Sequence, residues 1–319
     1  MERRNLIVQP VKLTCISLLT GKEMPIPYKT ILCLGNFDGV HPGHLALIRE
    51  SIRIRKTLGT DVLCGAFCFW EHSSDLLFQR PVEHLNSAEE RTELFAKAGL
   101  EFVIYADFAD LRALSPEVFA KEILANQCHC TAAVCGFNYR FGKGAAGTAE
   151  DLSRLLGAPV SVCPAVEIDG APVSSTRIRT AIREGKVSEA ARLLGRPFTL
   201  KGPVKHGKEL GRKLGFPTAN QEFSPFAAVP RHGVYATDCF LDGKWYRGVS
   251  NVGNHPTVDV PSTAVNCETY LLDYEGDLYG KTLTVEFLQF LRPEKTFESI
   301  ETLKKQIALD AEQASKFTE

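Results

Sequence analysis

The first half of the chain alternates short apolar runs with amphipathic stretches. Residues 30–34 form an apolar run of strand length, and residues 45–58 place apolar side chains near a 3.6-residue period, as a helix does. Strands that alternate with helices build βαβ units around a parallel sheet, so the pattern predicts a doubly wound, Rossmann-like α/β domain. The other elements expected there are residues 61–69, 88–98, 102–105, 116–125, 132–135, 149–156 and 160–163.

The pattern changes after Gly185. A short helical run at residues 187–194 leads into closely spaced strands, and Asp242-Gly243 and residues 275–277 are hairpin turn signals. Closing such strands on themselves removes exposed edges, so we expect a small antiparallel β-barrel. An amphipathic helix at residues 297–316 follows it. The expected strands are 198–204, 233–241, 244–251, 264–274 and 281–291, and the two predicted domains are residues 1–185 and 186–319.

Composition narrows the function classes. The 319 residues carry 37 Lys and Arg against 38 Asp and Glu, and a net charge of -1 gives no general attraction to nucleic acid or to an anionic membrane. A nucleic-acid-binding barrel is also disfavoured, because the aromatic residues do not interleave with a basic stripe. Residues 1–5 lead into no apolar core of signal-peptide length, and no stretch reaches the roughly 18 apolar residues of a membrane span. We therefore expect a cytoplasmic protein with small-molecule partners and at most weak self-association.

The ten cysteines of such a chain are expected to be free thiols in strands and helices. Cys128, His129 and Cys130, with Cys135 nearby, lack the paired spacing of a structural zinc site. The sequence therefore predicts no disulfide framework and no zinc site.

The most informative segment is residues 35–44, Gly-Asn-Phe-Asp-Gly-Val-His-Pro-Gly-His, which joins the first strand to the first helix. Its glycines let the backbone approach a ligand closely, and the helix N-terminus offers N–H groups to an anion. His41 and His44, three residues apart, add donors where negative charge builds on a phosphate. The simplest alternative is that His41 caps the helix and His44 packs in its first turn.

This segment resembles the H-x-G-H signature of the nucleotidylyltransferase superfamily, in the F-D-G-V-H form of bacterial bifunctional riboflavin kinase/FAD synthetases. Residues 134–143, VCGFNYRFGK, resemble that family's G-[DN]-[FY]-R-F-G segment, and residues 173–179, VSSTRIR, resemble its I-S-S-T-R-I-R loop. Three motifs in order are far more specific than one. The chain departs from the family at residues 66–73, AFCFWEHS, where relatives carry a T-F-x-P-H-P-like segment, so we expect a reshaped loop there.

The resemblance implies an FMN adenylyltransferase site in the first domain, where the phosphate of FMN attacks the α-phosphate of ATP and pyrophosphate leaves. It implies that His41 and His44 stabilise charge at the α-phosphate and that Arg177 holds the leaving phosphates. The implied nucleotide contacts are Gly35, Asn36, Phe37, Asp38, Gly43, Ser175, Thr176 and Arg179, and the implied FMN contacts are Phe137, Asn138, Tyr139 and Arg140.

A second set of motifs begins at residues 202–209, GPVKHGKE. This nearly spells a P-loop, but Glu209 stands where Ser or Thr is needed and no helix pattern follows. With its continuation at residues 211–220, GRKLGFPTAN, it resembles the riboflavin kinase family. The likeness persists through residues 251–257, 267–274 and 277–280.

This second resemblance implies that Glu268 is the base that takes a proton from the ribityl hydroxyl of the flavin, and that Arg292 lies near the flavin. The implied ATP contacts are Gly202, Lys205, Gly207, Gly215, Thr218 and Asn220, and the oxygen donors of Thr218 and Asn220 suit Mg²⁺. Without the family pattern, Thr218 is a turn residue, Glu268 a solvated strand residue and Arg292 an exposed strand-end arginine.

Together the motifs predict a bifunctional enzyme that uses MgATP to phosphorylate riboflavin to FMN and then adenylylates FMN to FAD. The alternative is an adenylyltransferase for another phosphorylated metabolite, with the barrel kept as a degenerate flavin-binding module. Residues 142–147 also fit G-x-G-x-x-G. Those glycines begin several residues after the expected strand end, which disfavours an NAD-binding fold.

Overall fold

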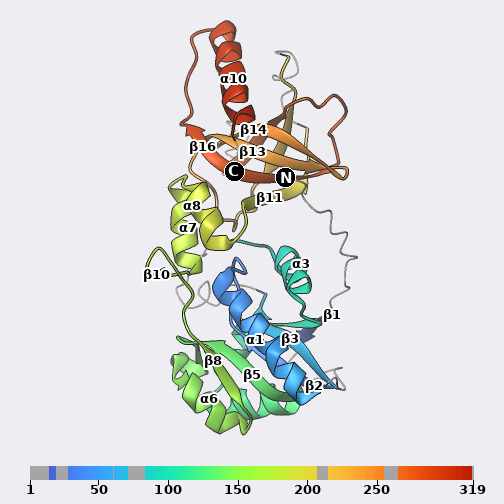
Figure 1. The fold of residues 1–319 in the computed structure, drawn as a ribbon, viewed down its shortest axis with the longest axis vertical. Helices are drawn as coiled ribbons and strands as arrows, with labels where there is room; N and C mark the ends of the chain where they lie inside the picture. The colour runs from blue at the N-terminus through green and yellow to red at the C-terminus, as the bar shows by residue number, and fades with distance from the viewer. Residues whose placement is uncertain are drawn as a thin grey trace. The chain divides into compact units, whose positions relative to one another are not determined.

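The chain forms two compact units, Met1–Ser174 and Ser175–Glu319 (Figure 1). A computed structural model of the protein describes residues 14–18, 28–59, 61–70, 83–206, 215–254 and 265–317. The domain boundary expected from the sequence, between residues 185 and 186, falls after the first helix of the second unit and stays a prediction.

The N-terminal unit is built on a six-stranded parallel sheet in the order β1-β4-β3-β2-β5-β8. From β2 the chain moves outward through β3 to β4, then crosses back to place β5 on the other side of β2. The strand order therefore reverses between β2 and β5, and ligands of open α/β sheets bind at the carboxyl ends of strands at such a point. The strands are β1 Thr14–Leu18, β2 Lys29–Leu34, β3 Val62–Phe69, β4 Phe102–Ala106, β5 Cys130–Gly136 and β8 Val160–Cys163.

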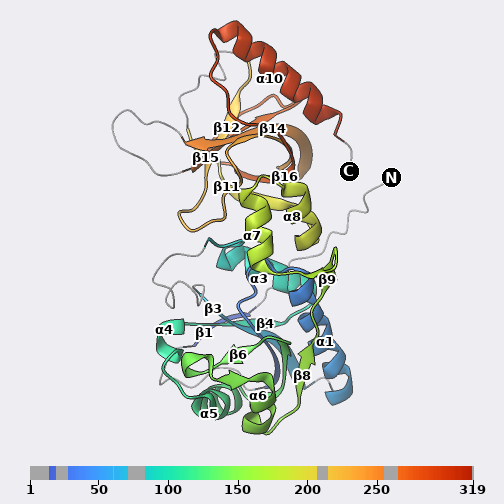
Figure 2. The same ribbon diagram turned by 90° about the vertical axis from the view of Figure 1, so that its left-hand side faces the viewer.

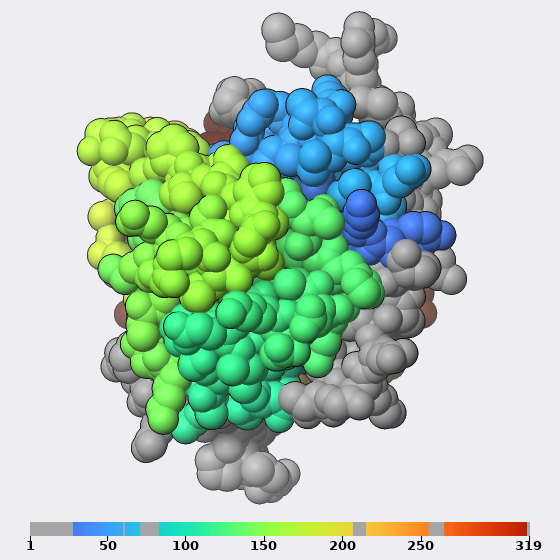
Figure 3. Space-filling model, turned by 90° about the horizontal axis from the view of Figure 1, so that it is seen from below, coloured from blue at the N-terminus to red at the C-terminus, as the bar shows by residue number. Residues whose placement is uncertain are grey.

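Helices cover both faces of this sheet, which confirms the doubly wound architecture. The helices α1 (Pro42–Leu58) and α3 (Ala88–Ala98) pack on one face through a cluster that includes Ile48 and Phe95. On the surface α1 lies beside β8 (Figure 3), where the Ser161 hydroxyl donates to Glu50 at 2.8 Å. The nine cysteines whose side chains the structure describes are buried free thiols, as expected, and burial raises the pKa of Cys135 to about 11.

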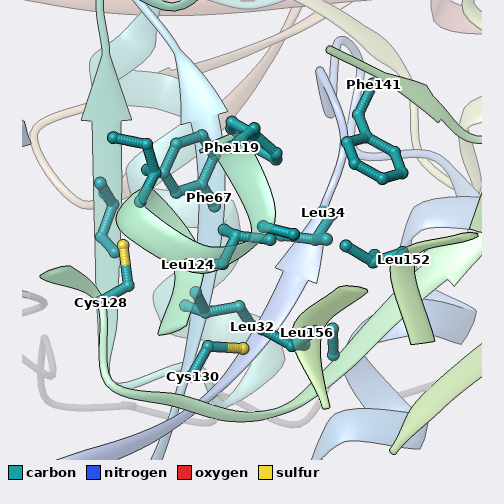
Figure 4. Packing of buried hydrophobic residues seen from close by; sticks show 14 of the residues in the cluster. Leu32, Leu34, Phe67, Phe119, Leu124, Cys128, Cys130, Phe141, Leu152 and Leu156 are labelled. Carbon is teal, nitrogen blue, oxygen red and sulfur yellow. The ribbon is translucent and has the colours of Figure 1, made fainter. Parts of the chain in front are cut away.

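The opposite face carries α6 (Ala149–Leu156) and a π-helix, η1 (Phe119–Gln127), which begins where the short α5 (Pro116–Val118) ends. Phe67, Phe119 and Phe141 meet the aliphatic side chains of β2 and α6 there (Figure 4). Short elements complete the unit: α4 Phe108–Leu111, η2 Lys143–Ala145, and the strand pairs β6 Arg140–Phe141 with β7 Gly147–Thr148 and β9 Glu167–Ile168 with β10 Ala171–Pro172.

The C-terminal unit opens with two helices, α7 (Ser175–Arg183) and α8 (Val187–Leu194), and continues as an antiparallel sheet in the order β11-β16-β13-β14-β15-β12. The sheet curls (Figure 2) until its first and last strands meet at a bridge between Lys205 and Asn220. Gln221 donates from inside to the carbonyl oxygens of Gly202 and Leu283. The strands are β11 Phe198–Pro203, β12 Thr218–Glu222, β13 Gly233–Leu241, β14 Lys244–Asn254, β15 Val265–Leu271 and β16 Thr282–Arg292.

The terminal helix α10 (Ile300–Ser315) packs on the outer face of β13 and β14, where Ala314 meets Val234, Ala236 and Val249. This confirms the expected small barrel with a helix at its end. The barrel interior holds a chain of buried hydroxyls instead of a wholly apolar filling. Thr237 bonds Ser250 at 3.0 Å and Ser250 bonds Thr269 at 2.8 Å, so each polar group has a partner.

Three expectations about local structure need correction. The element expected at residues 116–125 is the short α5 followed by the π-helix η1, which extends to Gln127. The strands β1 and β12 were not expected. The segment at residues 173–179 was expected to be a loop, but α7 begins at Ser175. That expectation was wrong because Ile178, Ala181 and Ile182 follow the helical period, and burial of this apolar face stabilises the helix.

Candidate active sites

The loop between β2 and α1 is a strained turn at the carboxyl edge of the parallel sheet. Phe37 and Val40 both have positive φ, 55° and 39°, although neither is a glycine, and both side chains are buried. Such conformations are costly and cluster at ligand sites, because surrounding packing must hold them. The Phe37 ring packs edge-on against Phe95 at 5.3 Å, so the structure places this expected nucleotide contact in the core.

His41 and His44 lie stacked on each other over the first turn of α1. Their ring centroids are 3.8 Å apart and their planes are 18° apart. His41 occupies the N-cap position but its side chain makes no capping hydrogen bond, which argues against a simple capping role. A Cβ on Gly43 would lie 3.0 Å from His41 Cε1, so any larger residue there would press against the His41 ring.

The His44 imidazole is held in its neutral form. Loss of hydration, together with the neighbouring His41 and the positive charge of Arg91, holds the pKa of His44 well below its ordinary value of 6.5. Its Nδ1 is buried and has no hydrogen-bond partner in the described part of the chain. No acidic side chain stands in the first turn of α1, whose N–H groups face the same region. This helix end can receive a phosphate.

Asp38 and Arg91 fix the loop from two sides. The buried Asp38 carboxylate accepts the backbone N–H of Leu85 at 2.8 Å. Arg91, buried in α3, donates to the carbonyl oxygens of Asn36 and Phe69, both at 2.9 Å. These contacts use the Asp38 carboxylate and the backbone carbonyl of Asn36, and the nucleotide contacts expected of both residues stay predictions. The sequence did not single out Arg91, because an arginine in an amphipathic helix is normally a solvated residue.

The expected FMN contacts follow β5, the strand next to β2. Phe137 is 57% exposed, and Asn138 and Arg140 are also exposed at this edge of the sheet. Tyr139 instead packs into the core, stacked on Phe141 at 5.9 Å, and burial raises the pKa of its hydroxyl. The structure therefore exposes three of the four side chains at the carboxyl edge of the sheet and packs the fourth, Tyr139, against the core; contact with FMN stays a prediction.

The expected pyrophosphate contacts lie in the first two turns of α7, at the start of the C-terminal unit. Ser175, Thr176 and Arg177 begin the helix, which has no acidic residue in its first turn. Arg179 is buried and donates weakly to the Thr176 hydroxyl at 3.4 Å, and Arg177 stands 3.9 Å from Glu189 of α8. That these side chains share one site with the histidines stays a prediction.

In the barrel, strand register assembles a row of polar side chains. Asn220 of β12 and Asn251 of β14 both lie opposite Glu268 of β15, so the three side chains stand next to one another on one face. Thr218, two residues before Asn220, shares that face. It is the outer face of the sheet, the one on which α10 packs farther along.

Asn251 and Glu294 were not assigned a role from the sequence. The Asn251 carboxamide donates to the Glu294 carboxylate at 3.1 Å. A Cβ on Gly253 would lie 2.2 Å from Glu294 Oε1, so this approach requires a glycine. The N-V-G-N segment was visible in the sequence, but only the strand register shows that it borders Glu268.

Of the other expected ATP contacts, Lys205 donates its backbone N–H to the Asn220 carbonyl at 2.8 Å and pairs its ammonium group with Glu222. Gly215 has a φ of 88°, a left-handed conformation that favours glycine. Gly202 lies in β11 next to Gln221, and Gly207 lies outside the described residues.

Arg292, the expected flavin contact, is engaged with the terminal helix. Its guanidinium binds both carboxylate oxygens of Asp310, the shortest contact being 2.7 Å, and Gln306 donates to the same carboxylate at 2.9 Å. The side chains of Arg292 and Asp310 are only 14% and 4% exposed. The arginine is therefore neither a solvated strand end nor available for a flavin without rearrangement.

The two units thus define a nucleotidylyltransferase-like α/β domain and a flavokinase-like barrel in one chain. Family models agree: a model described as FAD synthetase matches residues 23–177, and one described as riboflavin kinase matches residues 194–318. Among the described residues, no helix has the length and apolar character needed to cross a membrane.

Full-length relatives match in the same way. A bifunctional riboflavin kinase/FMN adenylyltransferase of Listeria monocytogenes is 34% identical over 294 residues, covering 90% of this chain and 92% of that protein. The protein of the same name from Pseudomonas fluorescens is 36% identical over 285 residues, covering 88% and 90%. The chain belongs to the bifunctional riboflavin kinase/FMN adenylyltransferase family.

A solved structure from Streptococcus pneumoniae shares the whole fold. It is described as a macrolide-efflux protein, is 31% identical, and gives a TM-score of 0.85 over 96% of this chain and 100% of that one. Its description differs from the names of the relatives above, but its fold is the same two-unit fold.

Proposed function

We propose that the C-terminal unit phosphorylates riboflavin with ATP to give FMN, and that the N-terminal unit transfers AMP from a second ATP to FMN, giving FAD and pyrophosphate. The observation that supports this proposal is that each unit carries a polar centre of its own: the stacked histidines at the start of α1, and the Asn220–Glu268–Asn251 row in the barrel.

In adenylyl transfer, an oxygen of the FMN phosphate attacks the α-phosphorus of ATP, and the bond to the β-phosphate breaks. Charge grows on the α-phosphate oxygens and on the departing pyrophosphate. His41 and His44 donate to the α-phosphate from a position fixed by stacking, while Ser175, Thr176 and the guanidinium groups of α7 hold the pyrophosphate. A neutral His44 serves as a hydrogen-bond donor here and needs no proton exchange.

In the kinase unit, Glu268 takes the proton of the terminal ribityl hydroxyl as that oxygen attacks the γ-phosphorus of ATP, and ADP leaves. The carboxamides of Asn220 and Asn251 flank Glu268 in the strand register, where they limit the directions that the carboxylate can take for this transfer. The contact between Asn251 and Glu294 fixes one of these flanking groups in turn.

The same face fits a hard divalent cation. The Thr218 hydroxyl and the Asn220 carboxamide oxygen are the donor types that Mg²⁺ accepts alongside phosphate oxygens and water. When bound, Mg²⁺ neutralises charge on the β- and γ-phosphates of ATP. Thr218 and Asn220 are the residues that would hold it. The partners that this function requires are the small molecules riboflavin, FMN and ATP. We also propose that the protein works in the cytosol, where ATP is supplied.

The direct test is to incubate the purified protein with riboflavin, ATP and Mg²⁺ and to separate the flavins over time. We expect FMN to appear first and FAD to follow. A second incubation that begins with FMN should give FAD without the kinase step. If neither incubation changes the flavin, the proposed function is wrong.

A further inference from the structure

Trp70 is an exposed aromatic side chain with a fixed position. It follows β3 directly, and 45% of its surface is exposed. Its backbone N–H donates to the Ala106 carbonyl at 3.2 Å, which ties it to the end of β4. One face of the indole stacks on Tyr105, with ring centroids 4.4 Å apart and planes 21° apart. The exposed surface is therefore that of a flat ring backed by another ring.

The supporting Tyr105 is itself immobile. Its side chain is 1% exposed, and its hydroxyl donates to the Ala88 carbonyl at 2.9 Å and shares a hydrogen bond with Thr92. The guanidinium carbon of Arg91 lies 5.1 Å from the centroid of the Tyr105 ring. A ring held by its hydroxyl, its neighbours and a cation gives Trp70 a rigid base.

The same arginine links this stack to the histidine loop. Arg91 donates to Phe69, the last residue of β3, and to Asn36 of the loop. Tyr105 belongs to the same buried cluster as Phe37 and Val40, so the stack stands on the sheet face that carries α1 and the histidines. Trp70 thus borders the phosphate site at the carboxyl edge of β3, the strand beside β2.

We propose that Trp70 binds the isoalloxazine ring of FMN in the adenylyltransferase site, with the flavin stacked on the indole. The inference rests on the proposed adenylyl transfer, which requires a flat flavin ring to be held while its phosphate reacts. An electron-rich indole stacks best on an electron-poor ring, and isoalloxazine is more electron-poor than adenine. This subsite belongs to the segment where the chain departs from its family's T-F-x-P-H-P-like pattern.

Steady-state kinetics of FAD formation from added FMN test the proposal. Trp70→Ala should raise the KM for FMN about tenfold, in line with the usual strength of ring stacking, and change the KM for ATP and the kcat by less than about twofold. Trp70→Phe, which keeps a flat ring, should retain most of the affinity. An unchanged kcat for FAD formation reports that the N-terminal unit of the variant is folded, and riboflavin phosphorylation by the same preparations reports the same for the C-terminal unit.

A matched control exists because the sequence contains only two tryptophans. Trp245, in the C-terminal unit, is 47% exposed and lies at 50° to Phe240 in a tilted pair. Trp245→Ala should leave the KM for FMN unchanged, which separates a specific stack from the loss of any exposed indole.

A spectroscopic measurement detects the contact itself. An indole stacked on oxidised flavin adds a broad long-wavelength shoulder to the flavin absorption. Wild-type protein with FMN and a non-hydrolysable ATP analogue should show it, and Trp70→Ala should lose it while Trp245→Ala keeps it.

If wild-type protein forms FAD but Trp70→Ala has an unchanged KM for FMN and an unchanged spectrum, the Trp70 assignment is overturned. A rise in the KM for ATP alone would place adenine there instead and also overturn it. Absence of FAD with wild-type protein would refute the proposed function.

Discussion

The two units build their polar centres in opposite ways. In the N-terminal unit one continuous segment, residues 35–44, supplies the turn, both histidines and the helix end, and strain in its backbone is held by the core beneath. In the C-terminal unit, residues from three strands meet only because of strand register. The first centre is local in sequence and the second depends on tertiary structure, so different changes should damage each.

The largest expected effect is on the barrel. Glu268→Gln keeps the shape of the side chain but removes the proton acceptor, so FMN formation should fall by about 10²–10⁴-fold. FAD formation from added FMN should be unchanged. Flavin separation after incubation with riboflavin, and separately with FMN, measures both rates. Equal losses in the two reactions would contradict the independence of the two centres.

The second-largest expected effect is on adenylyl transfer in the N-terminal unit. His44→Ala removes a fixed donor to the α-phosphate, so FAD formation should fall by about 10²–10³-fold. Riboflavin phosphorylation should continue at the wild-type rate, which the same assay records. His44→Asn, which retains a donor, is the companion variant and should recover part of the lost rate. No recovery with Asn would indicate that the imidazole ring, stacked on His41, matters more than donation.

A smaller effect concerns the stability of the barrel. Asp310→Asn leaves the buried Arg292 guanidinium without its carboxylate, so the free energy of unfolding of this unit should fall by about 3 kcal/mol. Urea unfolding followed by Trp245 fluorescence, in a Trp70→Phe background, measures it. Glu312→Gln breaks an exposed pair with Lys316 on the same helix and is the control, expected to have no measurable effect. An equal fall in the free energy of unfolding in both variants would show that the Arg292–Asp310 pair stabilises the unit no more than an exposed ion pair does.

The smallest effect is a pH dependence confined to the N-terminal unit. Because the pKa of His44 is depressed in the folded state, the unfolded chain binds one more proton once the pH falls below about 6.5. Stability of this unit should therefore decrease by about 1.4 kcal/mol per pH unit on acidification through that range, on account of this residue. The contribution of His44 can be measured by unfolding Trp245→Phe protein at several pH values, with and without His44→Gln, and following Trp70 fluorescence. A slope unaffected by His44→Gln would contradict it.

The sequence predicted elements best where local signals were complete. Residues 88–98 form α3 with the expected bounds, because Ser87 and Glu90 make a capping box and Gly99 ends the helix in a left-handed conformation. It failed for β12, Thr-Ala-Asn-Gln-Glu, which has no apolar alternation and is a strand only because β15 and a bridge to Lys205 pair with it. Local composition carries no signal for that pairing.

The candidate sites show the same division. His41, His44 and the α1 end could be found from sequence because they are contiguous. Tyr139 and Phe37 could not be placed, since a motif does not show which aromatic rings face the core. Arg91, Asn251 and Glu294 became visible only through hydrogen bonds that join segments far apart in the sequence.

The polar row exists only if β12, β15 and β14 pair in the correct register, so the activity of the barrel reports whether these strands have paired correctly. Side chains alternate between the faces of a strand, so a slip of β15 by one residue would turn Glu268 into the interior and bring Cys267 or Thr269 outward. A barrel that refolds to native compactness with the wrong pairing would still give ordinary spectra but would turn over no riboflavin. Recovery of flavin phosphorylation after refolding therefore counts correctly registered molecules, which no bulk measure of secondary structure can do.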